Sequence, residues 1–452
     1  MGTRHRQLHD ELSELRISEL NISELTERGP SSCKPFRNKF EKIWPYGSAA
    51  NRGTFFASKR SWQFQGLQVQ GLQGEFVDVA TRQKQHMDVL SRFMVLAYCE
   101  TAVGPAPAQI ELEPFDLLEP ALKYVANLDP SHLAEFLDLA DTHHVLVRTL
   151  TVLEATAAAL GDSPMAEWCA ERLTNERPHI QHSVGRLHAI CDALESRDCP
   201  VSVIKSLDHW PDLGSDLDLY TTAPQQAVEE VMRAQLKAHP VERSWGDRLA
   251  NKWNYRVPGL CELVEIHVQY LGQTGEHSQM ARRVVDRRVR KQVGGLPFHV
   301  PAPEERIVIS TLQRVYRHFY FRLCDMIDFA VLLETEDVQF SELRRSAEMA
   351  AIWPGVATFL ALVQNYVESY GGRVSLPQEV LDSARSRAVG VQFAGGFLRV
   401  SKLTAARLYG LQLLRAGRKG DLRAIARLPL LPPLAVSAVL AHGITGNDKG
   451  IW

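Results

Sequence analysis

The chain has 452 residues, which at roughly 150 residues per domain suggests two or three packed units, and its 45% hydrophobic and 23% charged residues are typical of a globular protein. This composition excludes wholesale disorder, a collagen-like repeat and a coiled-coil rod. The formal charge of −2 gives no whole-chain attraction to nucleic acid or to a membrane, so any basic site must be local.

The sequence carries no pattern for export or membrane insertion. No apolar run follows the basic residues of the N-terminus, and no stretch reaches the roughly 18 apolar residues of a membrane span. The seven cysteines are scattered singly without a Cys-x-x-Cys pair, which argues against a disulfide framework and a zinc knuckle. We therefore expect a cytoplasmic protein without a membrane partner.

Two regions precede the first strand pattern. Residues 1–78 predict a tail with a short Ile-Ser-Glu-Leu echo, followed by an irregular segment. Residues 79–194 carry apolar side chains at spacings of three and four, which predicts a domain of amphipathic helices. Five histidines of this domain have spacings that do not repeat and lack an acidic companion in a recognisable motif, so we expect no metal site from them. They are His143, His144, His179, His182 and His188.

Between residues 195 and 275 the hydrophobic period changes to two. Residues 201–204 and 263–270 predict strands, and residues 217–219 interleave leucines with an aspartate. Residues 224–238 predict a helix between them. A strand, a helix and a strand within about seventy residues predict a compact α/β core.

Helical patterns return in the rest of the chain. Residues 276–370 predict a helical domain that completes the core, with helices over 278–293, 303–334 and 340–356. Residues 371–452 predict a further helical region, in which twelve basic residues against four acidic ones give a net charge of +8 and leave the remainder at −10. The predicted fold class is α+β, a small mixed sheet with helices embedded between largely α-helical regions.

The residues that carry chemistry begin with Asp216 and Asp218. Side chains alternate along a strand, so two aspartates separated by one residue project from the same face. Like charges at this spacing repel unless a cation lies between them. Paired carboxylates suit Mg²⁺, which completes its coordination with water and phosphate oxygens. The pair therefore predicts a divalent metal site.

A second predicted strand offers a third carboxylate. Glu265, His267 and Gln269 share one of its faces, while valines and an isoleucine share the other. If the two strands are neighbours, Asp216, Asp218 and Glu265 converge on one patch, as metal-assisted phosphoryl transfer requires. The plainer interpretation is a loop cap and a solvated strand residue, and a bare Asp-x-Asp pair is common by chance. The third carboxylate within a strand favours the site.

These motifs resemble the nucleotidyltransferase superfold, in which an apolar strand ends in a glycine-containing turn, an Asp-x-Asp strand follows, and a later strand bears a third Asp or Glu. More narrowly, the sequence is similar to the uncharacterised nucleotidyltransferase family with Lys-Gly, Asp-x-Asp and Asp-x-His strand motifs. The matching segments are Val203-Ile-Lys-Ser206, Asp216-Leu-Asp218 and Glu265-Ile-His267, and the likeness covers roughly residues 187–334. It implies a nucleotidyltransferase-type sheet in the 195–275 core.

The resemblance also implies roles for these residues. Asp216, Asp218 and Glu265 would be catalytic and would ligate Mg²⁺, or Mn²⁺ in its place. An NTP would bind at the turn after the first strand, where this chain departs from the family because Lys205 and Ser206 stand where glycine is usual. Ser206 can keep the role through its hydroxyl and amide, whereas Lys205 either adds a charge at the phosphates or points to solvent.

Two further residues belong to the expected nucleotide site. Ser215 follows Gly214 in a small-residue turn, which either contacts phosphates or lets the chain enter the metal strand tightly. His267 shares the face of Glu265, where it orients substrate, assists proton transfer or is simply a hydrogen-bonded strand histidine.

Basic residues outside this group have two interpretations. Six cations and one acid lie within ten residues of the helix expected at 278–293, and Arg314, Arg317 and Arg322 lie on the next expected helix. Such residues bind phosphates or nucleic acid, or they form a solvated helix face, which is the commoner outcome.

The sequence favours a Mg²⁺-dependent nucleotidyltransferase. It would transfer a nucleoside monophosphate from an NTP such as ATP to an acceptor hydroxyl or phosphate and release pyrophosphate. The acceptor, whether small molecule, protein or RNA, stays open, as do the NTP base and the oligomeric state. The alternative is an inactive nucleotidyltransferase-like protein that binds nucleic acid or another partner through its basic C-terminal helices. Three retained carboxylates disfavour it, because like charges repel without a cation.

Overall fold

The computed structural model describes residues 70–99, 114–384, 390–434 and 436–437, with side chains described from residue 79 and, in the second range, from residue 117. The chain divides into two compact units, of which one comprises residues 20–82. The described part of that unit is the beginning of helix α2 (Gln70–Tyr98). The predicted tail and most of the irregular segment over residues 1–78 lie outside the described residues. The other unit carries all the features that follow.

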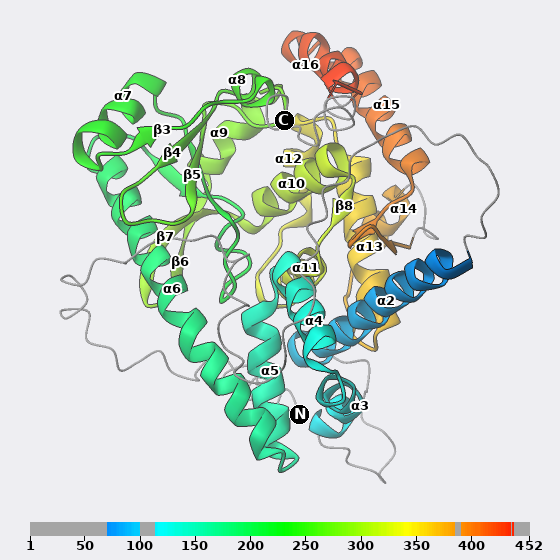
Figure 1. The fold of residues 1–452 in the computed structure, drawn as a ribbon. Helices are drawn as coiled ribbons and strands as arrows, with labels where there is room; N and C mark the ends of the chain where they lie inside the picture. Colours follow the sequence, from blue (N-terminus) through cyan, green and yellow to red (C-terminus); the bar gives the residue numbers. More distant parts are fainter. Residues whose placement is uncertain (1–69, 100–113, 385–389, 435, 438–452) are drawn as a thin grey trace, which may run out of the picture. The chain divides into compact units, whose positions relative to one another are not determined.

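Helices lead up to the sheet, as the apolar spacing of residues 79–194 predicts. Asp129 caps α4 by accepting the Ser131 and His132 amides, and Asp162 caps α6 by accepting the Met165 amide. Helix α6 contacts the first strand and delivers the chain to it. The helices of this region are α3 (Pro114–Ala126), α4 (Pro130–Thr142), α5 (Leu146–Ala159) and α6 (Ser163–Glu195) (Figure 1).

The described residues form a mixed sheet of five strands in the order β1-β2-β5-β4-β3. Strand β2 runs antiparallel to β1 and parallel to β5, and the other neighbours are antiparallel. Buried leucine, valine and isoleucine side chains on β2 and β5 anchor the sheet in the core. The strands are β1 (Val201–Val203), β2 (Asp216–Thr221), β3 (His239–Pro240), β4 (Lys252–Arg256) and β5 (Leu263–Val268). The predicted α+β class, with a small mixed sheet between helical regions, is confirmed.

The connection from β2 to β5 contains more structure than the predicted helix alone. The helix expected at 224–238 is present as α7 (Gln225–Glu230), which continues into the π-helical turn η4 (Val231–Gln235). Strands β3 and β4 follow, with α8 (Trp245–Ala250) between them. The central sheet therefore has two strands that the sequence reading did not include.

The helix predicted over residues 278–293 is wrong in its second half. Helix α9 (Gln279–Asp286) is present, but the next residues form strand β6 (Arg288–Val293), which pairs with β7 (Leu296–Pro301). Gly294 and Gly295 connect the two strands with φ values of +57° and +77°. Two consecutive positive φ values suit a two-residue hairpin turn and end the helical path.

The helices predicted over 303–334 and 340–356 are each interrupted, the first at residues 319–322 and the second at residues 350–352. Phe319, at a φ of +57°, ends the π-helical turn η5 (Arg314–His318) and directs the chain into the short strand β8 (Tyr320–Phe321). The elements around it are α10 (Pro303–Gln313), α11 (Leu323–Thr335), α12 (Phe340–Met349), α13 (Trp353–Ser369) and α14 (Gln378–Ser383). In the ranges that are described, none of the helices combines the length and apolar character that a membrane span needs.

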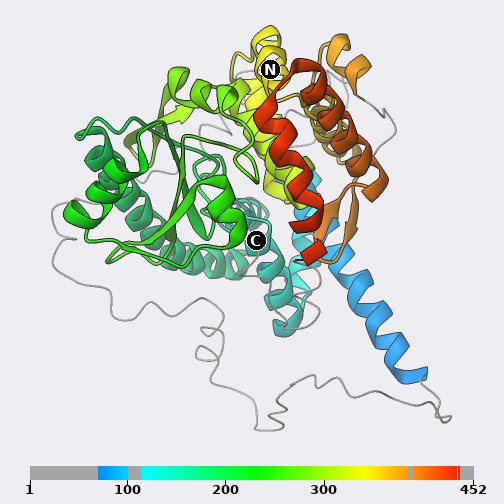
Figure 2. The same cartoon turned by 90° about the horizontal axis from the view of Figure 1, so that it is seen from above.

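The C-terminal region is helical as predicted, apart from a hairpin that the sequence reading missed. Strands β9 (Gln392–Ala394) and β10 (Phe397–Arg399) flank Gly395 and Gly396, and β10 also pairs with β8. The helices are α15 (Lys402–Lys419), α16 (Leu422–Arg427) and the 3₁₀ turn η6 (Leu428–Leu430). Both views place α16 on the side of α15 that is nearer to the sheet (Figures 1 and 2).

Candidate active site

The parallel pairing of β2 with β5 brings the three predicted carboxylates onto one patch. The register sets Asp218 directly beside Glu265, and Asp216 lies two residues earlier on the same face of β2. The side chains of Asp218 and Glu265 are 14% and 12% exposed, whereas Asp216 is at the open end of the strand. The expected adjacency of the two strands is thus confirmed.

Lys205 points at these carboxylates, which neither sequence interpretation foresaw. Its Nζ lies 2.5 Å from Oδ1 of Asp218 and 3.9 Å from Oε1 of Glu265. The backbone φ of Lys205 is +63°, in the left-handed region that glycine adopts freely and lysine seldom does. The lysine therefore keeps a backbone shape suited to glycine while adding a cation to the acidic patch.

Ser206 ties the turn to the metal strand. Its Oγ accepts the backbone amide of Asp218 at 2.8 Å and donates to the carbonyl of Asp216 at 3.2 Å, and its own amide donates to the carbonyl of Ile204 at 2.6 Å. The Ser206 side chain is also buried. Both groups that the sequence assigned to a triphosphate thus have partners within the protein.

Two further basic groups contact the carboxylate of Glu265. Lys252 on β4 places Nζ 2.9 Å from Oε2 of Glu265 and 2.7 Å from Oδ1 of Asp247. His267 donates from Nε2 to Oε1 of Glu265 at 2.9 Å and lies 3.7 Å from Oδ1 of Asp218. Burial alone would raise the pKa of Glu265, but Lys252 and the hydrogen bond from His267 outweigh it and hold the pKa well below its usual range.

Lys252 was absent from the sequence prediction. The alternation of polar and aromatic side chains over residues 252–256 is a strand signal that would have placed Lys252, Asn254 and Arg256 on one face. The pairing of β4 with β5 sets Lys252 opposite His267 and Asn254 opposite Glu265. The charge of Glu265 is therefore compensated from a neighbouring strand.

Asp216 has the opposite electrostatic character. Desolvation, followed by repulsion from Glu265 and Asp218, raises the pKa of Asp216 to about 6. Ser215 is exposed beside it, with Oγ 3.4 Å from Oδ2 of Asp216. The acidic patch is thus compensated at Glu265 and Asp218 and least compensated at Asp216.

The donor set fits a divalent cation. Asp218, Glu265 and His267 have ligand atoms that all lie within 4.8 Å of one another, and Asp216 adds a carboxylate on the same face. Carboxylate oxygens suit Mg²⁺ and Mn²⁺, whereas Nε2 of His267 is engaged with Glu265. The raised pKa of Asp216 is what an acidic cluster shows when it lacks enough positive charge.

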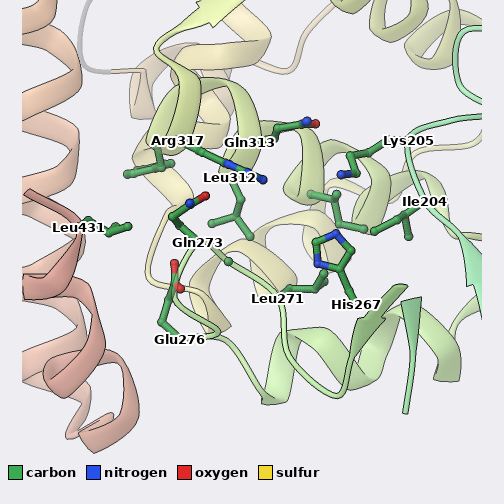
Figure 3. A pocket seen from close by; sticks show the side chains of 13 residues that line it. Ile204, Lys205, His267, Leu271, Gln273, Glu276, Leu312, Gln313, Arg317 and Leu431 are labelled. Carbon is green, nitrogen blue, oxygen red and sulfur yellow. The ribbon is translucent and has the colours of Figure 1, made fainter. Parts of the chain in front are cut away.

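A pocket borders this patch on the side of Lys205. Figure 3 shows Lys205 and His267 entering it from one side and Arg317 and Gln273 from the other (Figure 3). Its cavity of about 40 Å³ is room for about three water molecules. Oε1 of Gln273 and Nδ1 of His267 are buried in its wall without a hydrogen-bond partner, which is typical of a site that receives a polar ligand.

Of the three arginines expected near the site, Arg317 alone lines the pocket. It lies in the π-helical turn η5, and such turns are frequent at functional sites. Arg314 instead forms an ion pair with Asp325 at 2.8 Å, and Arg322 lies at the start of α11, where its backbone amide donates to Oδ2 of Asp325 at 2.7 Å. The sequence alone did not separate the three, because their roles depend on where η5 ends.

Three of the six cations in the basic run over 282–291 form internal ion pairs. Arg283 and Arg287 both bind Glu305 on α10, at 2.9 Å and 3.0 Å, and Arg288 binds Glu195. These cations join α9 and β6 to the helices around them. The solvated helix face expected for this run is therefore not what the structure has, because three of its arginines pair internally and its second half is strand β6.

The histidines considered for a metal site do not converge on one point, and His144 packs against the ring of His209. His143 contacts the Gly396 carbonyl, His179 contacts Glu262, and His188 contacts Asp192. None of the five belongs to a cluster of metal-ligating groups among the residues that the structure describes.

Two arginines of the basic C-terminal region hold the loop that follows β5. Arg423 donates to the carbonyl of Gly275 at 2.7 Å and lies 3.6 Å above the ring of Tyr270. Arg427 donates to the carbonyls of Leu249, at 2.7 Å, and of Thr274. Because this loop supplies Gln273 to the pocket, α16 supports one wall of the candidate site.

Comparison with known proteins yields only distant similarity. No family model matches the sequence, and no curated protein matches it. Among solved structures, the antibiotic-resistance factor ANT(2'')-Ia is 11% identical, with 35% of this chain and 86% of that chain covered at a TM-score of 0.26. An antigenic nucleotidyltransferase-like protein from Paracoccidioides brasiliensis is 15% identical, with 44% and 97% covered at a TM-score of 0.30. Similarity this low does not identify a substrate.

Proposed function

We propose that the chain is a Mg²⁺-dependent nucleotidyltransferase, which moves a nucleoside monophosphate from an NTP to an acceptor hydroxyl or phosphate and releases pyrophosphate. The observation that carries the proposal is the parallel register of β2 and β5, which sets Asp218 beside Glu265 with Asp216 on the same face. Three carboxylates on one open patch are the arrangement that metal-assisted phosphoryl transfer uses.

In this proposal Asp216, Asp218 and Glu265 hold the metal. Mg²⁺ bound there would neutralise the charge that develops on the phosphoryl group during transfer. Lys252 and His267 keep Glu265 ionised and fixed in direction, since both contact its carboxylate at 2.9 Å. Their role is positioning, which the depressed pKa of Glu265 supports.

The phosphates would lie on the pocket side of the patch. Lys205 and Arg317 are the cations that line this pocket, and Ser215 is exposed beside Asp216. Ser206 would act indirectly, by holding the turn that carries Lys205 against β2. We leave the acceptor open between a small molecule, a protein and an RNA, because the flanking helices that would select it carry no recognisable acceptor motif.

The test is Mg²⁺-dependent binding and turnover of labelled NTPs. The purified chain is incubated with each α-³²P-labelled NTP and Mg²⁺, and pyrophosphate release and nucleotide binding are measured for wild type and Asp218→Asn. Asp138→Asn on α4, where the aspartate is exposed and away from the patch, is the matched control. We expect Asp218→Asn to lose turnover and metal-dependent binding while Asp138→Asn keeps both. Equal binding and turnover in wild type and Asp218→Asn would refute the proposal.

A further inference from the structure

The turn that carries Lys205 is built independently of the lysine. The amide of Ser206 donates to the carbonyl of Ile204, and the amide of Asp208 donates to the carbonyl of Lys205 at 2.9 Å. Lys205 occupies the left-handed region at a φ of +63° within this turn. A non-glycine residue persists in that region only where its surroundings impose it. The turn therefore fixes the origin of the lysine side chain.

From this origin the side chain reaches across the acidic patch. The ammonium lies 2.5 Å from Asp218 and 3.9 Å from Glu265, and the side chain is 11% exposed. Arg317, the other cation of the pocket, has no acidic partner within the described ranges. Lys252 contacts only Glu265 among the three carboxylates, so the Lys205 ammonium is the lysine charge that lies near the carboxylates of both β2 and β5.

An ammonium at this position competes with a divalent ion. Mg²⁺ binds carboxylate oxygens at about 2.0–2.1 Å, so an ion on Oδ1 of Asp218 would lie within a few ångströms of the ammonium. Two cations at such a distance repel strongly in a partly buried site. Binding of a metal to Oδ1 of Asp218 therefore requires that Lys205 leave this oxygen.

We infer that, without nucleotide, the Lys205 ammonium occupies the cation position at Asp218. A divalent metal then binds Asp218 together with the NTP, because the phosphates of the NTP bind the ammonium in place of Asp218. This inference rests on the proposed function and adds to it an order of binding. Metal alone binds weakly, and the metal–nucleotide pair binds well.

The pocket provides space into which the Lys205 side chain can move. Lys205 lines it together with Arg317, and the four-carbon stem of a lysine lets its ammonium move while the backbone stays fixed. The cavity of about 40 Å³ has room for about three water molecules, and its polar wall can receive phosphate oxygens. Movement of Lys205 away from Asp218 thus accompanies filling of the pocket by phosphate oxygens.

The consequence is positive coupling between metal and nucleotide. Typical couplings between two ligands change affinity about 5- to 150-fold, and each ligand affects the other by the same factor. In wild type the nucleotide must remove the ammonium from Asp218, so nucleotide should raise metal affinity strongly. In a chain without the ammonium, metal should bind Asp218 unaided and the coupling should shrink.

The experiment measures Mn²⁺ binding by electron paramagnetic resonance of free Mn²⁺, so its readout does not depend on turnover. The full chain is titrated with and without α,β-methylene-ATP, as wild type, Lys205→Met and Lys205→Gly. The glycine variant removes the ammonium and also suits the positive φ, which separates charge from backbone strain. The control is Lys291→Met. Lys291 is a half-buried lysine whose Nζ donates to the carbonyl of Leu207 at 3.3 Å, and it makes no ion pair with Asp216, Asp218 or Glu265.

Without nucleotide, we expect both Lys205 variants to bind Mn²⁺ at least about tenfold more tightly than wild type. Addition of the nucleotide should raise the Mn²⁺ affinity of the variants by a smaller factor than it raises that of wild type. Lys291→Met should match wild type. The inference would be overturned if both Lys205 variants bound Mn²⁺ without nucleotide no more tightly than wild type. It would also be overturned if wild type bound Mn²⁺ tightly without nucleotide.

Failure of the proposed function has a different signature. The Lys205→Met/Asp218→Asn double variant should lose the Mn²⁺ binding that Lys205→Met gains, which locates the metal at the carboxylates. If this double variant binds Mn²⁺ as Lys205→Met does, the metal lies elsewhere and the order of binding inferred for Asp218 is wrong. If wild type and Asp218→Asn bind the metal–nucleotide pair equally, the proposed function itself fails.

Discussion

Replacing Glu265 by Gln tests whether the acidic patch is held together by its buried cations. The substitution keeps the shape of the side chain but removes its charge. Lys252 would lose the partner 2.9 Å from its Nζ and keep Asp247, while His267 would lose the carboxylate that accepts from its Nε2. Since the Lys252 side chain is 8% exposed, water does not replace the lost partner.

The expected loss in the free energy of unfolding is about 3 kcal/mol. Removing one partner of a buried ion pair typically costs about 3–5 kcal/mol, and the lower end applies because Asp247 remains on Lys252. This is a large share of the total stability of a folded protein, which is about 5–15 kcal/mol. Glu229→Gln is the matched control, since Glu229 makes a surface pair with Arg233 on the same helical turn and should change stability by less than about 0.5 kcal/mol.

The assay is urea denaturation followed by tryptophan fluorescence, for Glu265→Gln, Lys252→Met and the double variant. Because the two side chains are in contact, the double variant should lose about 1–3 kcal/mol less than the sum of the single losses. Additive losses, or a Glu265→Gln variant as stable as wild type, would refute the view that this pair stabilises the site.

The pH dependence follows from the depressed pKa of Glu265. The carboxylate contributes stability above its ordinary pKa of 4.5 and loses that contribution as pH falls through its lower folded value. The difference between wild type and Glu265→Gln should therefore stay constant from pH 7 to 5 and shrink in acid. A difference that grew in acid would contradict the assignment.

Two other substitutions test the framework around the site. Arg148→Met removes the guanidinium that binds Asp212 at 2.9 Å and Asp328 at 2.6 Å, and all three side chains are at most 5% exposed. The free energy of unfolding should therefore fall by about 3–5 kcal/mol in urea denaturation. A loss below about 1 kcal/mol would show that the network contributes little to stability. In Gly272→Ala, the new Cβ would lie 2.3 Å from the carboxyl carbon of Glu276, and residue 272 has a φ of +96°. The substitution should therefore lower the free energy of unfolding by about 1–3 kcal/mol and reduce the melting temperature. An unchanged melting temperature would show that the loop accommodates a side chain.

The acidic patch was predictable from sequence because it follows from strand periodicity. Asp216 and Asp218 alternate with buried leucines, and Glu265 alternates with a buried valine and isoleucine. Their face is therefore fixed by which side chains must enter the core. The neighbouring position of the two strands did not follow from chain order, because β3 and β4 lie between them in the sequence while β5 pairs directly with β2.

The direction of Lys205 was not predictable on the same basis. It depends on a left-handed backbone that sterics disfavour for lysine, and this backbone is imposed by the turn hydrogen bonds. Lys252 and Arg317 likewise depend on partners far away in the chain, namely the β4–β5 register and the end of η5. Local pattern carries no information about such long-range contacts.

The two missed hairpins had a local signal that the helical interpretation overrode. Gly294-Gly295 and Gly395-Gly396 each occupy positive φ between short strands. A pair of glycines between residues of alternating character favours a hairpin. At Gly294-Gly295, the arginines Arg288 and Arg290 favour a helix by their intrinsic propensity, which led to the helical prediction. The two glycines predicted the hairpin correctly.

The contacts of α16 also bear on how the protein is made on the ribosome. Arg423 reaches a carbonyl 148 residues earlier, in the loop that borders the pocket. Strands β2 and β5, with all three carboxylates, leave the ribosome long before this arginine is translated. The growing chain can therefore pair its strands early, but the wall that contains Gln273 gains its support only when α16 has emerged. Because Leu431, which follows α16, also lines the pocket, the pocket can be complete only after the segment through Leu431 has emerged.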